Sequence, residues 1–306
     1  MDSELAQKSL LVALGIVMFG LGLTLTLGDF VRVSKHPRAI AVALACQMLI
    51  LPVAAFGLIK AFDLSTAMAV GMMLLAASPG GMTANVLSHI FKGDVALNIS
   101  LTAVNAILAV VTIPLIANFA LQHFDDSGAS VGLQFGKTVQ VFAVVIVPVF
   151  LGVAVRELRP AFADGIGRPI RMASLALLVA VSTLTLFTEK DEATSYALEI
   201  GAVAVLFCMI SLFTGYFIPR LFGVVERQAI ACSMEIGIHN AALAMTIAIS
   251  IIGNKEMAVP AAVYSVVMLP LALLFGAYLR WGPRSTRATA ASEATAEPTN
   301  AASQHL

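Results

Sequence analysis

Long apolar runs, separated by short charged or turn-forming stretches, constrain this chain more than any other feature. Of its 306 residues, 59% are hydrophobic and only 12% are charged, whereas soluble domains average about 25% charged residues. The runs are long enough to cross a bilayer as helices. We therefore predict an all-α integral membrane protein with about nine transmembrane helices, at residues 9–28, 38–60, 66–89, 94–121, 134–155, 168–187, 195–219, 226–252 and 258–280.

The positions of the basic residues predict the orientation of the chain. With nine spans, thirteen of the 18 Lys and Arg residues fall on one side of the membrane and five on the other. Cytoplasmic loops are enriched in Lys and Arg, so we expect the N-terminus outside and the C-terminus in the cytoplasm. The expected location is the inner (plasma) membrane, with lipid around the chain and no nucleic-acid partner. Residues 284–306, rich in Ala, Thr, Ser and Glu, predict a disordered cytoplasmic tail.

Two of the predicted spans carry residues that interrupt a helix. The third contains Ser78-Pro79-Gly80-Gly81, where Pro removes a backbone donor and consecutive Gly residues weaken the helix. The eighth is interrupted by polar residues and a Gly over residues 235–240. Each is the second span of a group of three, and the two groups run in opposite directions. Matching broken helices in oppositely oriented halves are typical of inverted-repeat transporters, whose site lies where the breaks cross near the membrane midplane.

Glu235 is the only carboxylate deep within an apolar span. An ionised carboxylate is costly in hydrocarbon unless a cation, a partner or water compensates it. One interpretation is a neutral, hydrogen-bonded carboxyl group or one that faces water. The other is a cation ligand or a proton carrier, which we favour because acidic residues inside membranes usually mark ion paths.

Further polar side chains are candidates for the same site. Asn98 and Thr102 are four residues apart and therefore share a helix face, and Asn85 follows the Pro-Gly-Gly interruption. These residues and Gln47 supply either ion-binding oxygens or ordinary hydrogen bonds between helices. His239 has three interpretations: a neutral ring nitrogen as ligand, a proton acceptor, or a partner of a backbone carbonyl. The chain has no Walker loop, HExxH or zinc-spaced cysteine pair, so we expect no enzymatic activity.

Four segments of the chain together resemble the bile acid:sodium symporter family, and in particular its bacterial members. They are GIVMFGLGLTLTLGDF (15–30), ACQMLILPVAAF (45–56), ASPGGMTANVLSHIFKGDVALNISLTAV (77–104) and SMEIGIHNAALA (233–244). The resemblance covers the chain apart from its tail. It implies a core domain in which the two broken helices cross, and a panel domain beside it. The implied division is a first panel helix at 1–33, core helices at 34–122, panel helices at 134–188, core helices at 195–282 and the tail at 284–306.

The resemblance also implies two sodium sites. The first would comprise Ala84, Asn85, Asn98, Thr102 and Glu235, with Ala84 contributing only its backbone. The second would comprise Gln47, Glu235, Ile236, Ile238 and His239. His239 stands where the family pattern has Gln, and its nitrogen is a poor ligand for a hard cation. The second site is therefore expected to be weak, lost or sensitive to pH.

These features together predict a sodium-coupled symporter of organic anions, such as bile acids or small carboxylates like pantoate, that works by alternating access. We expect one or two Na⁺ ions per cycle and a monomeric protein. The anion is expected near Thr83, His239 and Asn240, where helix N-termini favour negative charge. Two alternatives remain: a proton-coupled carboxylate transporter that uses Glu235 and His239, and a membrane receptor that transports nothing.

Overall fold

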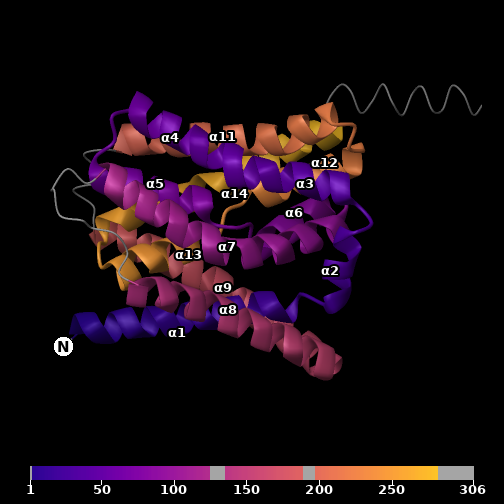
Figure 1. The fold of residues 1–306 in the computed structure, drawn as a ribbon, viewed down its shortest axis with the longest axis horizontal. Helices are drawn as coiled ribbons and strands as arrows, with labels where there is room; N and C mark the ends of the chain where they lie inside the picture. Colours follow the sequence, from indigo (N-terminus) through magenta and orange to yellow (C-terminus); the bar gives the residue numbers. More distant parts are fainter. Residues whose placement is uncertain (1, 125–134, 189–196, 282–306) are drawn as a thin grey trace, which may run out of the picture.

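The computed structural model describes residues 2–124, 135–188 and 197–281, and the elements in this part of the chain are helices joined by short connections (Figure 1). The predicted tail at 284–306 lies outside the described residues. The elements are α1 (Asp2–Leu23), α2 (Leu27–Val33), α3 (Pro37–Ala45), η1 (Cys46–Ile50), α4 (Leu51–Ala61), α5 (Thr66–Ala77), α6 (Met82–Ile90), α7 (Val95–Phe124), α8 (Phe135–Leu158), α9 (Pro160–Thr188), α11 (Ala197–Leu221), α12 (Glu226–Gly237), α13 (Ala241–Thr246), η2 (Ile247–Ile252), η3 (Glu256–Ala258) and α14 (Val259–Trp281).

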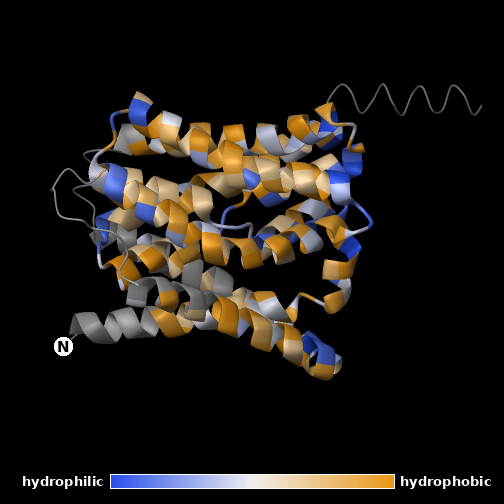
Figure 2. Cartoon of the chain, in the orientation of Figure 1, coloured by the Kyte–Doolittle hydropathy of each residue, from blue (hydrophilic) through white to orange (hydrophobic). Residues whose placement is uncertain are grey.

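The helices lie side by side, with apolar residues along their lengths and hydrophilic residues gathered at the two ends of the molecule (Figure 2). Within the described residues, four helices are long and apolar enough to cross a membrane, or five if one bent pair is counted as a single span; the four are Pro37–Ala61, Val95–Phe124, Ile200–Leu221 and Glu256–Trp281. The predicted class, an all-α multi-pass membrane protein, is confirmed. The number of nine crossings stays a prediction.

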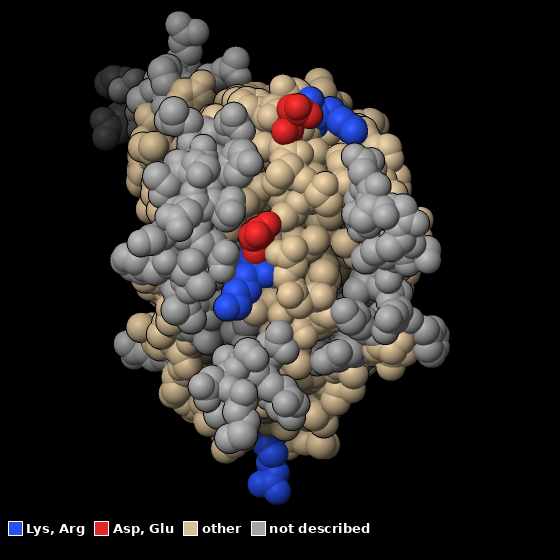
Figure 3. Space-filling model, turned by 90° about the vertical axis from the view of Figure 1, so that its left-hand side faces the viewer, with Lys and Arg blue, Asp and Glu red and all other residues tan. Residues whose placement is uncertain are grey.

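Charge differs between the two ends of the molecule. Figure 3 looks at the end that carries the N-terminus, where charged side chains are sparse among the described residues. The opposite end holds the starts of α3 and α12 and the end of α6 (Figure 1), and Arg38, Arg227 and Lys92 lie at these helix ends. The predicted orientation was based on this uneven distribution of basic residues. The structure does not test it, and it stays a prediction.

The first predicted span, 9–28, ends earlier than expected. The helix stops at Leu23, and α2 continues after a bend of 68°. The hydroxyl of Thr24 donates to the carbonyl of Leu21 at 2.7 Å, and both the amide and the hydroxyl of Thr26 donate to the carboxylate of Asp29 at 2.8 Å. Side chains of this kind compete with the helical hydrogen bonds and favour a cap. The apolar run alone did not reveal this bend.

Helix α1 packs against α8 and α9, the layer at the bottom of Figure 1. The α1–α8 contact is close because both helices present a glycine. A Cβ atom at Gly22 would lie 2.2 Å from the carbonyl oxygen of Val149, and one at Gly152 would lie 2.4 Å from that of Phe19. Small residues allow this approach between membrane helices. These three helices fall in the ranges predicted for the panel domain, and the division into core and panel stays a prediction.

Both predicted interruptions are present, and they meet. The first break, Ser78–Gly81, separates α5 from α6, and the second break, Ile238–Asn240, separates α12 from α13. Gly80 and His239 form an antiparallel bridge, with the amide of Gly81 donating to the carbonyl of Ile238 at 3.2 Å and the amide of Asn240 to that of Pro79 at 2.8 Å. The two breaks thus satisfy one another's backbone groups, which non-helical backbone at membrane depth requires.

Candidate functional site

Glu235 lies on the last turn of α12, one turn before the second break, and is fully buried. Its Oε2 accepts a hydrogen bond from the hydroxyl of Thr102 at 2.6 Å, and its Oε1 accepts one from the amide of Asn105 at 3.2 Å. The carboxyl group also packs against Gly80 of the first break, where a Cβ atom would lie 2.4 Å from the carboxyl carbon. Because glycine has no Cβ atom, position 80 leaves space for the carboxylate at the crossing.

Asn105 is a partner of Glu235 that the sequence analysis missed. It lies on α7 three residues after Thr102 and seven after Asn98, so all three residues share one face of that helix. The signal was present in the spacing, since the face predicted from Asn98 and Thr102 extends to Asn105. The sequence did not reveal that this face meets α12.

The structure brings together most of the residues predicted for the first sodium site. The amide of Asn98 donates to the carbonyl of Ala84 at 3.0 Å, and the hydroxyl of Thr102 lies 3.0 Å from the carbonyl of Asn98. The same hydroxyl contacts the carboxylate of Glu235, so Thr102 connects Asn98 with Glu235. Asn85 follows Ala84 on α6, and its Oδ1 is buried. The carbonyl of Ala84, predicted as a backbone ligand, already accepts the bond from Asn98.

The crossing region holds several buried polar atoms that have no hydrogen-bond partner among the described residues. They are Gln47 Oε1, Asn85 Oδ1, Asn98 Oδ1, Asn105 Oδ1 and His239 Nε2. Buried polar groups are nearly always paired, so each unpaired one calls for an explanation. Four of the five are amide oxygens, and oxygen is the donor atom that hard cations prefer. The residues present therefore fit a small cation near the carboxylate of Glu235.

Two of the five residues predicted for the second sodium site, Gln47 and His239, meet at one backbone carbonyl. Gln47 belongs to the π-helical segment η1, and its amide donates to the carbonyl of Ser78 at 3.1 Å. Nδ1 of His239 lies 3.1 Å from the same carbonyl. A carbonyl oxygen only accepts, so Nδ1 carries the hydrogen and Nε2 of the neutral ring has a free electron pair. The carbonyl of Ile238 accepts a hydrogen bond from the amide of Gly81. Ile236 is buried within α12.

Aromatic side chains hold the ring of His239. The ring stacks on Phe207 with centroids 5.4 Å apart, and it meets Tyr264 edge to face at the same distance. The hydroxyl of Tyr264 donates to the carbonyl of Gly237 at 2.8 Å. Phe207, Tyr264 and the hydrogen bond of Nδ1 thus hold the ring, and Nε2 is its one nitrogen without a partner among the described residues.

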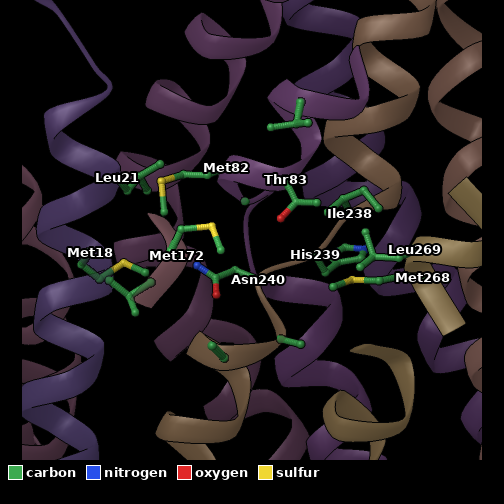
Figure 4. Close-up of a pocket in the computed structure, with 15 residues that line it drawn as sticks. Met18, Leu21, Met82, Thr83, Met172, Ile238, His239, Asn240, Met268 and Leu269 are labelled. Carbon is green, nitrogen blue, oxygen red and sulfur yellow. The ribbon is translucent and has the colours of Figure 1, made fainter. Parts of the chain in front are cut away.

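A cavity of about 250 Å³ lies beside the crossing (Figure 4). Thr83, His239 and Asn240, the three residues predicted to contact substrate, all line it. In Figure 4, Met18 and Leu21 of α1 lie on one side of it. The rest of its lining is Val17, Gly81, Met82, Val86, Met172, Ile238, Ala241, Ala242, Met268 and Leu269, so that no charged side chain is among the described residues around it.

The N-termini of two helices open onto this cavity. α6 begins after Gly81, and α13 begins after Asn240, whose Oδ1 caps it by accepting from the amide of Leu243 at 3.1 Å. The helix dipole makes such N-termini favourable for an anion. A largely apolar cavity with two such N-termini suits a ligand that has an apolar body and one anionic group.

The two sides of the crossing are packed differently. Helix α13, which leads away from the second break, packs against α1 and α9, and η2, which follows it, packs against α1 and α8. Helix α6, which leads away from the first break in the other direction, packs against α7, α12 and α14. The layer formed by α1, α8 and α9 is therefore engaged with the α13 side of the crossing.

A multi-pass helical protein in which two broken helices cross at a buried carboxylate, beside a cavity, has the architecture of a secondary membrane transporter. The family model of the sodium bile acid symporter family matches residues 11–195, which is more than half of the chain. The chain belongs to this family, and the predicted resemblance is confirmed.

Several characterised or named proteins are similar to this chain. It is 30% identical over 259 residues to the probable sodium/metabolite cotransporter BASS2, chloroplastic, of Oryza sativa subsp. japonica, across 84% of this chain and 60% of that protein. It is 28% identical over 257 residues to the uncharacterized sodium-dependent transporter YocS of Bacillus subtilis (strain 168), across 83% and 78%. It is 27% identical over 278 residues to the ileal sodium/bile acid cotransporter of Homo sapiens, across 89% and 79%. The chain thus spans less than two thirds of the length of the rice protein.

Proposed function

We propose that this protein is a sodium-coupled symporter of organic anions that works by alternating access. The observation that carries the proposal is Glu235, a fully buried carboxylate at the point where both broken helices meet. The unpaired amide oxygens nearby supply the further ligands that a sodium ion needs. The names of the three relatives, which are sodium cotransporters or a sodium-dependent transporter, support the same ion.

In this proposal, sodium is the co-substrate that joins α6 and α7 to α12. The ion would be held by Glu235, Asn85 and Asn98, with Thr102 and Asn105 orienting the carboxylate. Binding neutralises Glu235 and fixes the crossing, because residues from α6, α7 and α12 then share one charge. A fixed crossing keeps the N-termini of α6 and α13 aimed at the cavity. Sodium binding thereby favours anion binding without direct contact between the two.

The proposed substrate is an organic acid with an apolar body, from a small carboxylate such as pantoate to a bile acid. Its carboxylate would lie at the N-termini of α6 and α13, near Thr83 and Asn240, and its body against the methionines of the cavity. Methionine side chains adapt to irregular apolar surfaces. Alternating access would consist of moving the α1, α8 and α9 layer from α13 and η2 toward α6. The packing of that layer supports one end state of such a cycle.

The test is uptake of a labelled bile acid and of labelled pantoate into proteoliposomes with and without a sodium gradient. We expect uptake that depends on sodium in the unmodified protein and is lost in Glu235→Gln, which keeps the shape of the side chain and removes the charge. The matched control is Glu226→Gln, an exposed glutamate at the start of the same helix. Equal uptake with and without sodium would contradict the proposal.

Proton coupling is a second candidate, and one contact favours it. The hydroxyl of Thr102 has a single hydrogen but lies within hydrogen-bond distance of two acceptors, the carbonyl of Asn98 at 3.0 Å and Glu235 at 2.6 Å. A protonated Glu235 would donate to Thr102 and satisfy both contacts. This candidate requires that uptake follow an imposed pH gradient without sodium, and that His239→Gln remove the response.

A further inference from the structure

A second hollow lies at the end of the molecule, away from the crossing. It has a volume of about 790 Å³ and forms where α6 ends, α12 begins and α14 ends; the labels of α6 and α12 mark this end in Figure 1. We call it the basic groove, and its lining is His89, Phe91, Lys92, Gly93, Asp94, Val95, Ala96, Glu226, Arg227, Ile230, Leu279 and Arg280.

The charges in the basic groove do not balance. Lys92, Arg227 and Arg280 line it, and the ion pairs found among the described residues, Arg32 with Asp29 and Arg156 with Asp164, involve none of them. Two acids also line the groove: Glu226, and Asp94, which caps α7 by accepting from the amide of Leu97 at 3.0 Å. Three cations against two carboxylates leave the groove with an excess of one positive charge.

Hydrogen bonds and close packing connect the segments that line the basic groove. The amide of Asp94 donates to the carbonyl of Arg227 at 2.8 Å, which ties the start of α7 to α12. Phe91 is buried against α14, where a Cβ atom at Gly276 would lie 2.2 Å from its ring. Lys92 has a φ of +57°, and the amides of Lys92 and Gly93 donate to the carbonyls of His89 and Ser88 at 3.2 and 2.8 Å. This pattern is a Schellman cap, which ends α6 at the groove and fixes the backbone of Lys92.

Apolar side chains continue from the groove onto the exposed surface of the molecule. Ile90 is 47% exposed, and Trp281, whose ring meets Phe91 edge to face at 6.2 Å, is 67% exposed. Tryptophan is enriched where helices leave the hydrocarbon for the headgroup region. A headgroup in the groove would thus place its acyl chains beside apolar side chains.

We propose that the basic groove binds the phosphate headgroup of an anionic phospholipid. Basic pockets between transmembrane helices are suited to such headgroups, and here the unpaired cations come from the turn after α6, from α12 and from α14. Because α6 and α12 lead to the two breaks at their other ends, the bound lipid braces the helices that hold the crossing. The proposal does not depend on sodium coupling.

The only tryptophan of the chain, Trp281, contacts Phe91 of the groove lining and therefore reports on a lipid bound there. The full-length protein is reconstituted into phosphatidylcholine nanodiscs that contain a small, equal fraction of brominated phosphatidylglycerol or brominated phosphatidylcholine, and quenching of Trp281 fluorescence is measured. We expect stronger quenching by the anionic lipid, with an apparent preference of at least about fivefold, since each basic residue near an anionic surface contributes about that factor. This comparison uses the unmodified protein and needs no variant. Equal quenching by the two lipids overturns the proposal.

Two double variants test whether the cations of the basic groove cause the preference for the anionic lipid. Lys92→Gln/Arg227→Gln should lose the preference while Trp281 remains in place, and Lys35→Gln/Arg159→Gln, which removes two exposed cations outside the groove, should keep it. Loss of the preference in both double variants means that general surface charge attracts the lipid, which also overturns the proposal. Millimolar inorganic phosphate is added as a last arm. If it abolishes the preference at constant ionic strength, the groove favours free phosphate over the lipid headgroup, which overturns the assignment of a lipid as its ligand.

Discussion

The two breaks that meet at the crossing consist of different kinds of residue. The first break has Pro79, which lacks an amide hydrogen, followed by Gly80 and Gly81. The second break has neither proline nor glycine, since Gly237 still belongs to α12. Its ends are held by other parts of the chain: the hydroxyl of Tyr264 binds the carbonyl of Gly237, and the carbonyl of Pro79 accepts from the amide of Asn240.

This difference separates a local cause from a tertiary one. The first break follows from its own residues, because proline and consecutive glycines disfavour a continuous helix wherever they stand. The second break is held by contacts from α14 and from the first break, together with the cap that Asn240 gives to α13. The two breaks should therefore respond differently to substitution, and three predictions test this.

The largest effect is expected at Gly80 of the first break. In Gly80→Ala the new methyl group would lie 2.4 Å from the carboxyl group of Glu235 and would displace it. Overpacking of this kind costs about 1–3 kcal/mol, so we expect sodium affinity to fall by roughly 5-fold to 150-fold. The measurement is the sodium dependence of the thermal unfolding temperature of the purified protein. Gly81→Ala is the matched control, because a Cβ atom there has open space, and an equal loss in both variants would contradict the steric explanation.

A smaller effect is expected at Asn240 of the second break. In Asn240→Ala the amide of Leu243 loses the side-chain oxygen that caps α13, and loss of an N-cap costs about 1 kcal/mol. Thermal unfolding without sodium or substrate should show this loss of stability. Asn240→Ser restores a capping oxygen and should recover most of it. If serine and alanine are equally destabilising, the cap does not stabilise the second break.

The smallest effect is expected at Tyr264. Tyr264→Phe removes the hydroxyl that binds the carbonyl of Gly237 but keeps the ring that contacts His239. Hydrogen bonds between membrane helices contribute about 0.6 kcal/mol on average, so a slight fall in unfolding temperature is expected with little change in sodium affinity. Tyr264→Leu, which also removes the ring contact, should be clearly worse. A loss of sodium affinity in Tyr264→Phe equal to that in Gly80→Ala would remove the distinction between the breaks.

Much of the candidate site was predictable because its residues lie in locally readable patterns. Asn98 and Thr102 share a helix face by their spacing, and Glu235 stood out as a carboxylate within an apolar run. The structure adds Asn105, which extends that face and donates to Glu235 from 130 residues away in the chain. The expected interruption at 235–240 is shorter in the structure, because Glu235 and Gly237 keep their helical conformation. The roles of these residues in binding sodium stay predictions.

The amino-acid sequence by itself determined that the chain is helical and crosses a membrane, and that its third span is broken at Pro79. These properties depend on hydrophobic run length and on backbone chemistry, which act over a few residues. Only the tertiary structure decided that Gly80 lies against Glu235, that Gln47 and His239 share the carbonyl of Ser78, and that α1, α9 and α14 complete the cavity. Such contacts depend on which helices pack together, because a buried polar group takes its partner from whichever neighbour the packing brings within about 3 Å.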